Sequence, residues 1–185
     1  MSWIRVVNEA EANGELKKIY NDIAKKRGKI SNIMKIHSLN PEAMKKHMEL
    51  YLTLMFGHSN LSREERELIA VVVSSSNHCD YCVSHHAEAL NHYWKDNDLI
   101  KKLINDFRTV DISEKKRKML EYVFKLTKTP YDMKKADVEL LQKYGFSDED
   151  ILNINLITCY FNFVNRIALG LGVEFSSEEL AGYKY

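Results

Sequence analysis

The sequence predicts an all-α protein in which residues 1–185 form a single domain of about eight helices. The chain contains only two prolines and seven glycines, so few residues interrupt regular structure. Apolar residues recur at helical spacing along almost its whole length. Serine or asparagine stands repeatedly where a side chain would cap the start of a helix.

The first three helices follow from periodicity and from capping residues. Periodicity predicts a helix over residues 13–27. Asn40 caps a second helix over residues 41–56, which has proline at its first position. Ser62 and Glu65 form a capping box before a helix that enters the apolar run LIAVVV. This run has strong β propensity, but a strand there would have no evident partner, so we expect a helix.

Four more helices are predicted in the next part of the chain. Periodicity places two of them over residues 79–95 and 98–108. Ser113 begins the next, which ends before Pro130 because a residue that precedes proline disfavours the helical conformation. Another helix fits residues 133–144.

The last helix is predicted to be long. It begins at Ser147, where Asp150 three residues later completes a second capping box, and it continues to about Leu169. We expect Gly170 or Gly172 to end it, because glycine is the usual residue after the last helical turn.

A polar face interrupts this apolar helix at Asn162, Asn165 and Arg166. Such groups are costly in lipid, so we expect no transmembrane helix in this stretch, which is the most apolar of the chain. We interpret the face as a surface stripe or a subunit contact. The alternative is that it lines the functional site and that Arg166 pairs with a carboxylate.

The composition gives no reason to expect a charged partner. The net charge is +1, so the sequence predicts binding neither to nucleic acid nor to an anionic membrane. The first residues lack the apolar core of an export signal. Three cysteines do not make a disulfide scaffold in such a chain. We therefore expect a cytoplasmic protein.

The segment NHCDYCVSHH brings two cysteines together near the start of a helix. On a helical wheel, Cys79, Cys82 and His86 fall on one side together with apolar neighbours. His85 falls towards the polar side. We therefore expect both thiols and His86 to face the packed interior and His85 to be solvated.

A CxxC pair at the start of a helix is suited to thiol chemistry. Unpaired N–H groups at a helix N-terminus favour thiolate over thiol. Positions i and i+3 bring the two Cα atoms to roughly 5 Å, within the range that a disulfide accepts. One thiol can therefore attack a substrate while the other closes a disulfide. A disulfide across so short a loop would stabilise the fold little.

Glu67 is the fourth expected member of the site. A turn near Ser76 and Asn77 joins its helix to the cysteine helix. If the two helices run antiparallel, Glu67 and His86 stand level across the hairpin, because each is about ten residues from the turn. A carboxylate and an imidazole paired beside the thiols can move a proton to and from a cysteine.

Metal binding is an alternative use of these side chains, although we expect neither a metal nor a cofactor. The four ligands that zinc usually requires would be Cys79, Cys82, His86 and Glu67. Cys159 is too isolated in LITCYFNF to complete a metal site, and we expect it to be a small core residue. A c-type haem needs a histidine directly after the second cysteine, and Val83 stands there.

Glu67 is followed, after eleven residues, by Cys79, and then by Cys82 and His86. The spacing of these four residues resembles the signature of the alkyl hydroperoxidase D-like group. That group belongs to the carboxymuconolactone decarboxylase superfamily. Four segments extend the resemblance to its peroxidase-related branch over nearly the whole chain: GKISNIMKIHSLNPEAMKKH, LSREERELIA, NHCDYCVSHH and YFNFVNRIALGLGV.

The resemblance implies an all-helical fold that assembles into trimers or hexamers, and a thiol peroxidase that needs no cofactor. By the family pattern, Cys82 attacks the hydroperoxide and becomes a sulfenic acid. Cys79 resolves it as an intramolecular disulfide, which a dithiol such as a lipoylated protein or thioredoxin reduces. His86 and Glu67 relay the proton from Cys82.

The sequence departs from the family pattern at Tyr81. Alkyl hydroperoxidase D proteins carry a histidine between the two cysteines at this position. The helical wheel puts Tyr81 on the polar side, which predicts a place at the mouth of the site or in a subunit interface. The departure keeps open a redox-sensing or stress-linked oligomeric protein with little turnover. A carboxymuconolactone decarboxylase-type enzyme is a further alternative, although its chemistry does not need a CxxC pair.

Overall fold

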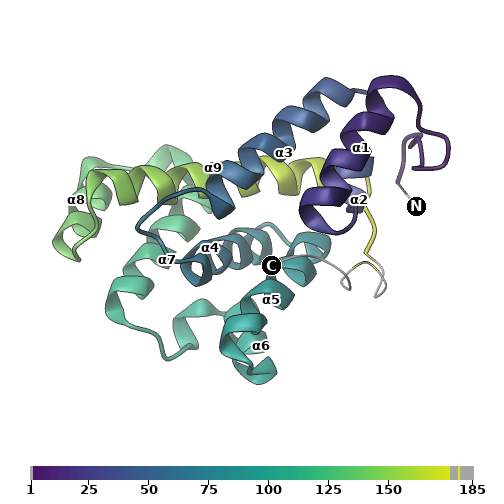
Figure 1. Ribbon diagram of the computed structural model, residues 1–185. Helices are drawn as coiled ribbons and strands as arrows, with labels where there is room; N and C mark the ends of the chain where they lie inside the picture. Colours follow the sequence, from purple (N-terminus) through teal and green to yellow (C-terminus); the bar gives the residue numbers. More distant parts are fainter. Residues whose placement is uncertain (1, 176–178, 180–185) are drawn as a thin grey trace.

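The computed structural model describes residues 2–175 and residue 179, and all regular structure within them is helical (Figure 1). The α-helices and 3-10 turns are α1 (Gly14–Arg27), α2 (Asn32–Lys35), α3 (Pro41–Phe56), α4 (Arg63–Ser76), α5 (Asp80–Trp94), α6 (Asn97–Asn105), η1 (Phe107–Thr109), α7 (Glu114–Lys128), η2 (Pro130–Asp132), α8 (Lys135–Lys143) and α9 (Asp148–Gly170). The prediction of an all-α protein is confirmed.

The helices begin at the predicted caps. Ser62 accepts a hydrogen bond from the backbone N–H of Glu65, whose carboxylate accepts one from the Ser62 N–H. Ser147 and Asp150 form the same reciprocal pair at the start of α9. These bonds satisfy N–H groups that have no partner inside the helix, so the capping boxes fix where α4 and α9 begin.

Two α-helices differ most from the prediction. The helix α2 was not predicted, because its four residues are too few to show a helical period. The helix predicted over residues 98–108 is shorter, since α6 ends at Asn105. Asp106 is extended there, with a φ of −159°, and its side chain accepts a hydrogen bond from the Arg108 N–H at the start of η1.

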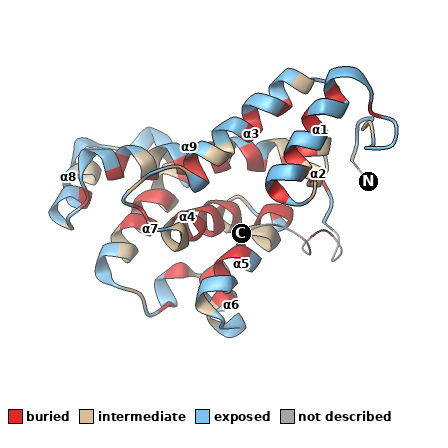
Figure 2. Cartoon of the chain, viewed as in Figure 1, coloured by how far each residue is buried: buried red, intermediate tan, exposed pale blue. Residues whose placement is uncertain are grey.

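The helix α4 occupies the centre of the fold and is packed by α5, α7 and α9 (Figure 1). The run LIAVVV, residues 68–73, is at most 1% exposed at every position. Figure 2 shows this central helix as almost continuously buried. The β propensity of the run is therefore overridden by its capped helical frame and by burial on all sides.

Two clusters of buried side chains meet beside α4. The larger one is built mainly from α4, α5, α6, α7 and α9. The smaller one joins α1, α2 and α3 and includes Ile23, Met34 and Met48. Ile33 and Tyr51 pack against both clusters. Cys79 and Cys82 belong to the larger cluster.

The longest helix, α9, leaves part of its apolar surface uncovered. Cys159 is exposed on this helix, so the prediction that it is a core residue is wrong. The apolar composition around it was misleading, because the same outward face carries the exposed Leu156 and Phe163. Within the described part of the chain, no helix has both the length and the apolar character that a membrane crossing requires.

Candidate active site

The turn between α4 and α5 positions the cysteine pair. Cys79 is the cap residue of α5, and its carbonyl accepts the first hydrogen bond of that helix, from the Val83 N–H at 2.8 Å. The Cys79 N–H donates to the Ser74 carbonyl at 3.0 Å, which ties the turn back to α4. His78 adopts a left-handed conformation with a φ of 56°, which reverses the chain. The predicted CxxC at a helix start is thereby confirmed.

The sulfur atoms of Cys79 and Cys82 lie 2.8 Å apart, joined by an S–H···S hydrogen bond. Both residues are buried, at 1% and 2% exposed. The bond from Cys82 lowers the pKa of Cys79, whereas the bond to Cys79 and burial raise the pKa of Cys82. The two thiols therefore lose their protons as a coupled pair, in which these interactions favour the first negative charge on Cys79.

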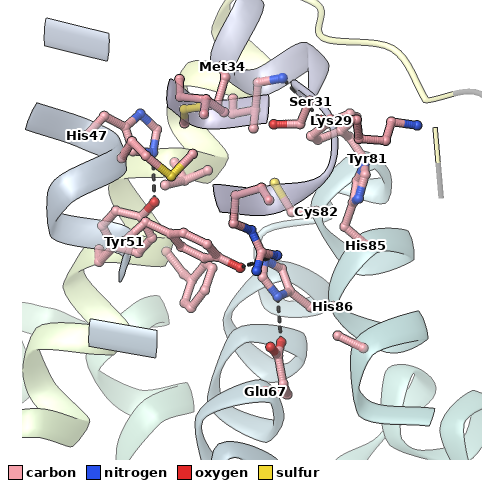
Figure 3. Close-up of a pocket in the computed structure, with 18 of the residues that line it drawn as sticks. Lys29, Ser31, Met34, His47, Tyr51, Glu67, Tyr81, Cys82, His85 and His86 are labelled. Carbon is pink, nitrogen blue, oxygen red and sulfur yellow. Dashed lines mark hydrogen bonds and ion pairs between the residues drawn. The ribbon is translucent and has the colours of Figure 1, made fainter. Parts of the chain in front are cut away.

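A cavity of about 90 Å³ opens beside the pair. Figure 3 shows Cys82 among the side chains that line it, with His47 and Tyr51 on one side, Tyr81 and His85 on the other, and His86 and Glu67 beyond. Cys79 does not contribute to the lining. Of the two sulfurs, Cys82 is therefore the one that a molecule in the cavity meets.

Glu67 and His86 form the pair that the hairpin geometry predicts. The Nδ1 atom of His86 lies 2.7 Å from Oε2 of Glu67 (Figure 3). The other carboxylate oxygen, Oε1, accepts two hydrogen bonds from the guanidinium of Arg63, one turn earlier in α4. The Glu67 side chain is only 1% exposed, and both of its oxygens have partners.

These partners fix the tautomer of His86. Burial raises the pKa of Glu67, but His86 and Arg63 outweigh this effect, so the pKa of Glu67 lies below its usual value and the carboxylate is ionised. An ionised carboxylate only accepts hydrogen bonds, so Nδ1 of His86 carries a hydrogen. The Nε2 atom is then the nitrogen that can accept a proton from a thiol.

The polar face of α9 divides between the site and the surface. Asn165 is fully buried; its amide oxygen accepts from Asn77, just after α4, at 3.0 Å, and its amide nitrogen donates to Ser74, near the end of α4, at 3.2 Å. Its hydrogen bond to Cys82 is the one interaction that lowers the pKa of that thiol. Arg166 is exposed and donates to Asn162, so it pairs with no carboxylate among the described residues.

The expectation that His85 is solvated is wrong. Its side chain is 14% exposed, as is that of His86, and both line the cavity. Tyr81 is also buried, at 6% exposed, although the helical wheel puts it on the polar side. Its hydroxyl accepts from the Ile33 N–H and donates to Glu179. Parts of the chain far from α5 in sequence cover its polar side, which a wheel for one helix cannot show.

The zinc alternative gains no support from this geometry. Both oxygens of Glu67 already accept hydrogen bonds, from His86 and Arg63. Within residues 2–175 and residue 179, no three His, Cys, Asp or Glu side chains are arranged to hold a metal ion.

Several polar residues at the site were not predicted as members, among them Arg63, Asn165, His47 and Tyr160. Arg63 could have been found, because it stands four residues before Glu67 on the same helix face. Asn165 was considered only as part of a polar face. His47 and Tyr160 also line the cavity, and no local pattern relates them, since they are 113 residues apart.

Comparison with known proteins agrees with this fold. Residues 41–105 match the model of the carboxymuconolactone decarboxylase family. The structure of an uncharacterized peroxidase-related protein from Silicibacter sp. TM1040 is 32% identical, with a TM-score of 0.87, over 99% of this chain and 96% of that one. A search of curated protein sequences gives no significant match.

Two other solved structures share the fold. An alkylhydroperoxidase AhpD core, an uncharacterized peroxidase-related protein from Ralstonia eutropha JMP134, is 28% identical with a TM-score of 0.86, over 97% of this chain and 94% of that one. The debrominase Bmp8 is 20% identical with a TM-score of 0.78, over 96% of this chain and 94% of its own. The likeness to the debrominase concerns the fold alone.

Proposed function

The chain belongs to the alkyl hydroperoxidase D-like group of the carboxymuconolactone decarboxylase superfamily, and from this we propose that it is a thiol-dependent peroxidase. The superfamily is named after an enzyme, and a related structure is described as an alkylhydroperoxidase core. One observation carries the proposal: Cys82 lines a small cavity, with a second thiol 2.8 Å behind it and an imidazole oriented by a buried carboxylate beside it.

The first chemical step is attack by Cys82 on the terminal oxygen of the hydroperoxide. His86 takes one proton from the thiol pair, and the remaining proton moves from Cys82 to Cys79 across their hydrogen bond. The S–O bond forms as the O–O bond breaks, which gives a sulfenic acid on Cys82 and an alkoxide. The alkoxide takes the proton from His86 and leaves as an alcohol.

The second step closes the disulfide. Cys79 attacks the sulfenic sulfur of Cys82, the S–S bond forms, and the hydroxyl leaves as water with the Cys79 proton. A dithiol then reduces the disulfide by giving two electrons and two protons. We propose a lipoylated protein or a thioredoxin-like protein as this reductant, in the cytoplasm, where such dithiols are kept reduced.

We also propose that the protein forms a homo-oligomer, a trimer or a hexamer. The support is an apolar stripe on α9, formed by Leu152, Leu156 and Phe163, which are 57%, 41% and 51% exposed. Their spacing puts them on one face of the helix, where a second copy of the chain can cover them.

The test is hydroperoxide consumption with a panel of dithiols, run beside cysteine variants. We expect Cys82→Ser and Cys79→Ser each to abolish turnover, and only Cys82→Ser to abolish sulfenic acid formation, detected by dimedone labelling. Cys159→Ser is the matched control, because this thiol is exposed on α9 and should leave turnover unchanged. Full peroxide reduction by Cys82→Ser would contradict the proposal.

Redox sensing with little turnover is the second candidate. The burial of both sulfurs favours it, because a protein reductant must reach a disulfide whose cysteines are 1% and 2% exposed. A sensor would form the disulfide quantitatively with peroxide but would not cycle with any dithiol. A carboxymuconolactone decarboxylase-type enzyme would instead keep its activity after both cysteines were alkylated, and an assay with γ-carboxymuconolactone measures this.

A further inference from the structure

A second chain of hydrogen bonds reaches the cavity from α3 and α9. The Tyr160 hydroxyl lies 2.7 Å from Nε2 of His47. Nδ1 of His47 lies 3.2 Å from Nε2 of His37, whose Nδ1 lies 2.9 Å from the Ile33 carbonyl oxygen. Tyr160 and His47 are each 5% exposed and line the same cavity as Cys82. The proposed peroxidase steps do not use this series of hydrogen bonds.

The direction of each hydrogen bond follows from the acceptor at the end of the chain. The Ile33 carbonyl can only accept, so Nδ1 of His37 carries a hydrogen. In a neutral His37, Nε2 then carries no hydrogen and accepts a hydrogen bond from Nδ1–H of His47. Nε2 of His47 therefore also carries no hydrogen and accepts a hydrogen bond from the O–H of Tyr160. Tyr160 has therefore committed its only hydrogen to His47.

The surroundings keep all three groups neutral, which this direction requires. Burial lowers the pKa of His37. Burial and the neighbouring His37 lower the pKa of His47 to about 3. Burial, Tyr51 and Cys82 raise the pKa of Tyr160 well above its usual value. At neutral pH the Tyr160 oxygen therefore offers the cavity lone pairs and no hydrogen.

We propose that the Tyr160 oxygen accepts the O–H of a hydroperoxide and thereby turns its terminal oxygen towards Cys82. This inference deepens the proposed peroxidase function and rests on it. A hydroperoxide has one hydrogen-bond donor, and that donor is on the oxygen that the thiolate attacks. No donor within the described part of the chain is hydrogen-bonded to the Tyr160 oxygen, so this acceptor is available to a ligand.

Tyr160 and His86 then recognise different oxygens of the same substrate. Tyr160 accepts a hydrogen bond from the terminal O–H. His86 first takes a proton from the thiol pair and then donates to the oxygen that bears the alkyl group. The S–O bond forms and the O–O bond breaks. The hydrogen stays on the terminal oxygen and ends on the sulfenic acid, so Tyr160 neither gains nor loses a proton.

The test compares two reagents that the Cys82 sulfur attacks, only one of which has a hydrogen-bond donor. In a Cys79→Ser, Cys159→Ser background, Cys82 is the only thiol of the chain. We expect Tyr160→Phe to slow sulfenic acid formation with tert-butyl hydroperoxide about tenfold, the value of one good hydrogen bond. Methyl methanethiosulfonate has no hydrogen-bond donor, so its rate should not change. No slowing, or equal slowing with both reagents, would overturn the inference.

Tyr122→Phe is the matched control. Tyr122 is 7% exposed, its hydroxyl accepts from Asn155 at 3.0 Å, and it does not line the cavity. We expect this variant to react with both reagents as the parent protein does. If it slowed the hydroperoxide reaction as much as Tyr160→Phe, loss of a buried hydroxyl would explain the effect and the inference would fall.

A ligand without an O–O bond separates this inference from the proposed function. We expect tert-butanol, which has an O–H donor, to protect Cys82 from methyl methanethiosulfonate better than methyl tert-butyl ether, which has none. Tyr160→Phe should abolish the difference. If no hydroperoxide is reduced but this difference is found, the peroxidase proposal fails and the acceptor role stands. Equal protection by alcohol and ether would overturn the acceptor role whatever the peroxidase activity.

Discussion

Glu67 is the residue on which the electrostatics of the site depend. A buried carboxylate is costly unless it is paired and hydrogen-bonded, and Arg63 and His86 provide partners for both oxygens. The carboxylate holds His86 in one tautomer and stabilises the positive charge that develops when the imidazole takes a thiol proton. Glu67 therefore acts on Cys82 through His86.

Replacing this carboxylate tests its role in proton transfer. We expect Glu67→Gln to lower kcat/KM for hydroperoxide about a hundredfold, because the amide keeps the shape but loses the charge and the fixed acceptor. Steady-state kinetics with saturating dithiol measure this. Glu88→Gln, at an exposed position of α5, is the control and should be neutral. An unchanged kcat/KM in a folded Glu67→Gln protein would contradict the assignment.

The same residue makes stability depend on pH. Burial raises the pKa of Glu67, but His86 and Arg63 lower it by more. The pKa of Glu67 in the folded protein is therefore below its value in the unfolded chain. Such a group stabilises the folded state above the unfolded pKa of about 4.3, and this contribution is lost as the pH falls through the folded pKa. Urea unfolding between pH 7 and pH 3 should therefore show a shallower acid decline for Glu67→Gln than for wild type. Equal declines would mean that other carboxylates carry the effect.

At the scale of single elements, the capping boxes determine where the helices that carry the site begin. Ser62 starts α4, which carries Arg63 and Glu67, and Ser147 starts α9, which carries Tyr160 and Asn165. A cap that fixes the first turn of a helix also fixes the direction of its later side chains. The local sequence at Ser62 and Ser147 therefore has consequences at the cavity.

Removing one cap should destabilise the whole fold measurably. We expect Ser147→Ala to lower the free energy of unfolding by about 1 kcal/mol, because it leaves the Asp150 N–H without its side-chain acceptor. Denaturant unfolding measures the change. Ser84→Ala, inside α5, is the control, and we expect it to be neutral or slightly stabilising because alanine favours helix interiors. A neutral Ser147→Ala would show that tertiary packing alone sets the start of α9.

At the scale of the whole molecule, the site lies where two cores meet. Ile23, Met34 and Met48 belong to the smaller cluster, and Cys82 and Phe161 belong to the larger one, yet all five line one cavity. Neither cluster alone would enclose Cys82. The packing of α1, α2 and α3 against the helices around α4 therefore creates the space in which a substrate would meet the thiol.

The apolar stripe on α9 predicts that copies of the protein associate through this helix. Light scattering should give the mass of a trimer or hexamer for the wild type and a smaller mass for Leu156→Glu, because a buried unpaired charge would oppose association. Leu39→Glu, at an exposed position before α3 and outside the stripe, should keep the wild-type mass. A monomeric wild type, or an unchanged mass for Leu156→Glu, would contradict the proposed interface.

Local sequence patterns were enough to predict the main helices and the grouping of Glu67, Cys79, Cys82 and His86. Caps and helical periods act over a few residues, so they predicted α4, α5 and α9 with starts that the structure shares. Fixed helical geometry put Cys79, Cys82 and His86 on one side, and hairpin spacing put Glu67 opposite His86. These relations depend only on local geometry and on one short turn.

The surroundings of these residues depend on how distant parts of the chain pack together. Tyr81 is buried and His85 is only 14% exposed because α2 and Glu179, which are distant in sequence, cover their side of α5. Tyr160 meets His47 across 113 residues of chain. Such contacts arise from the packing of whole helices, which no periodic pattern within one helix specifies. The thiol pair can therefore be found in the sequence, whereas the acceptor that would orient its substrate is visible only in the folded chain.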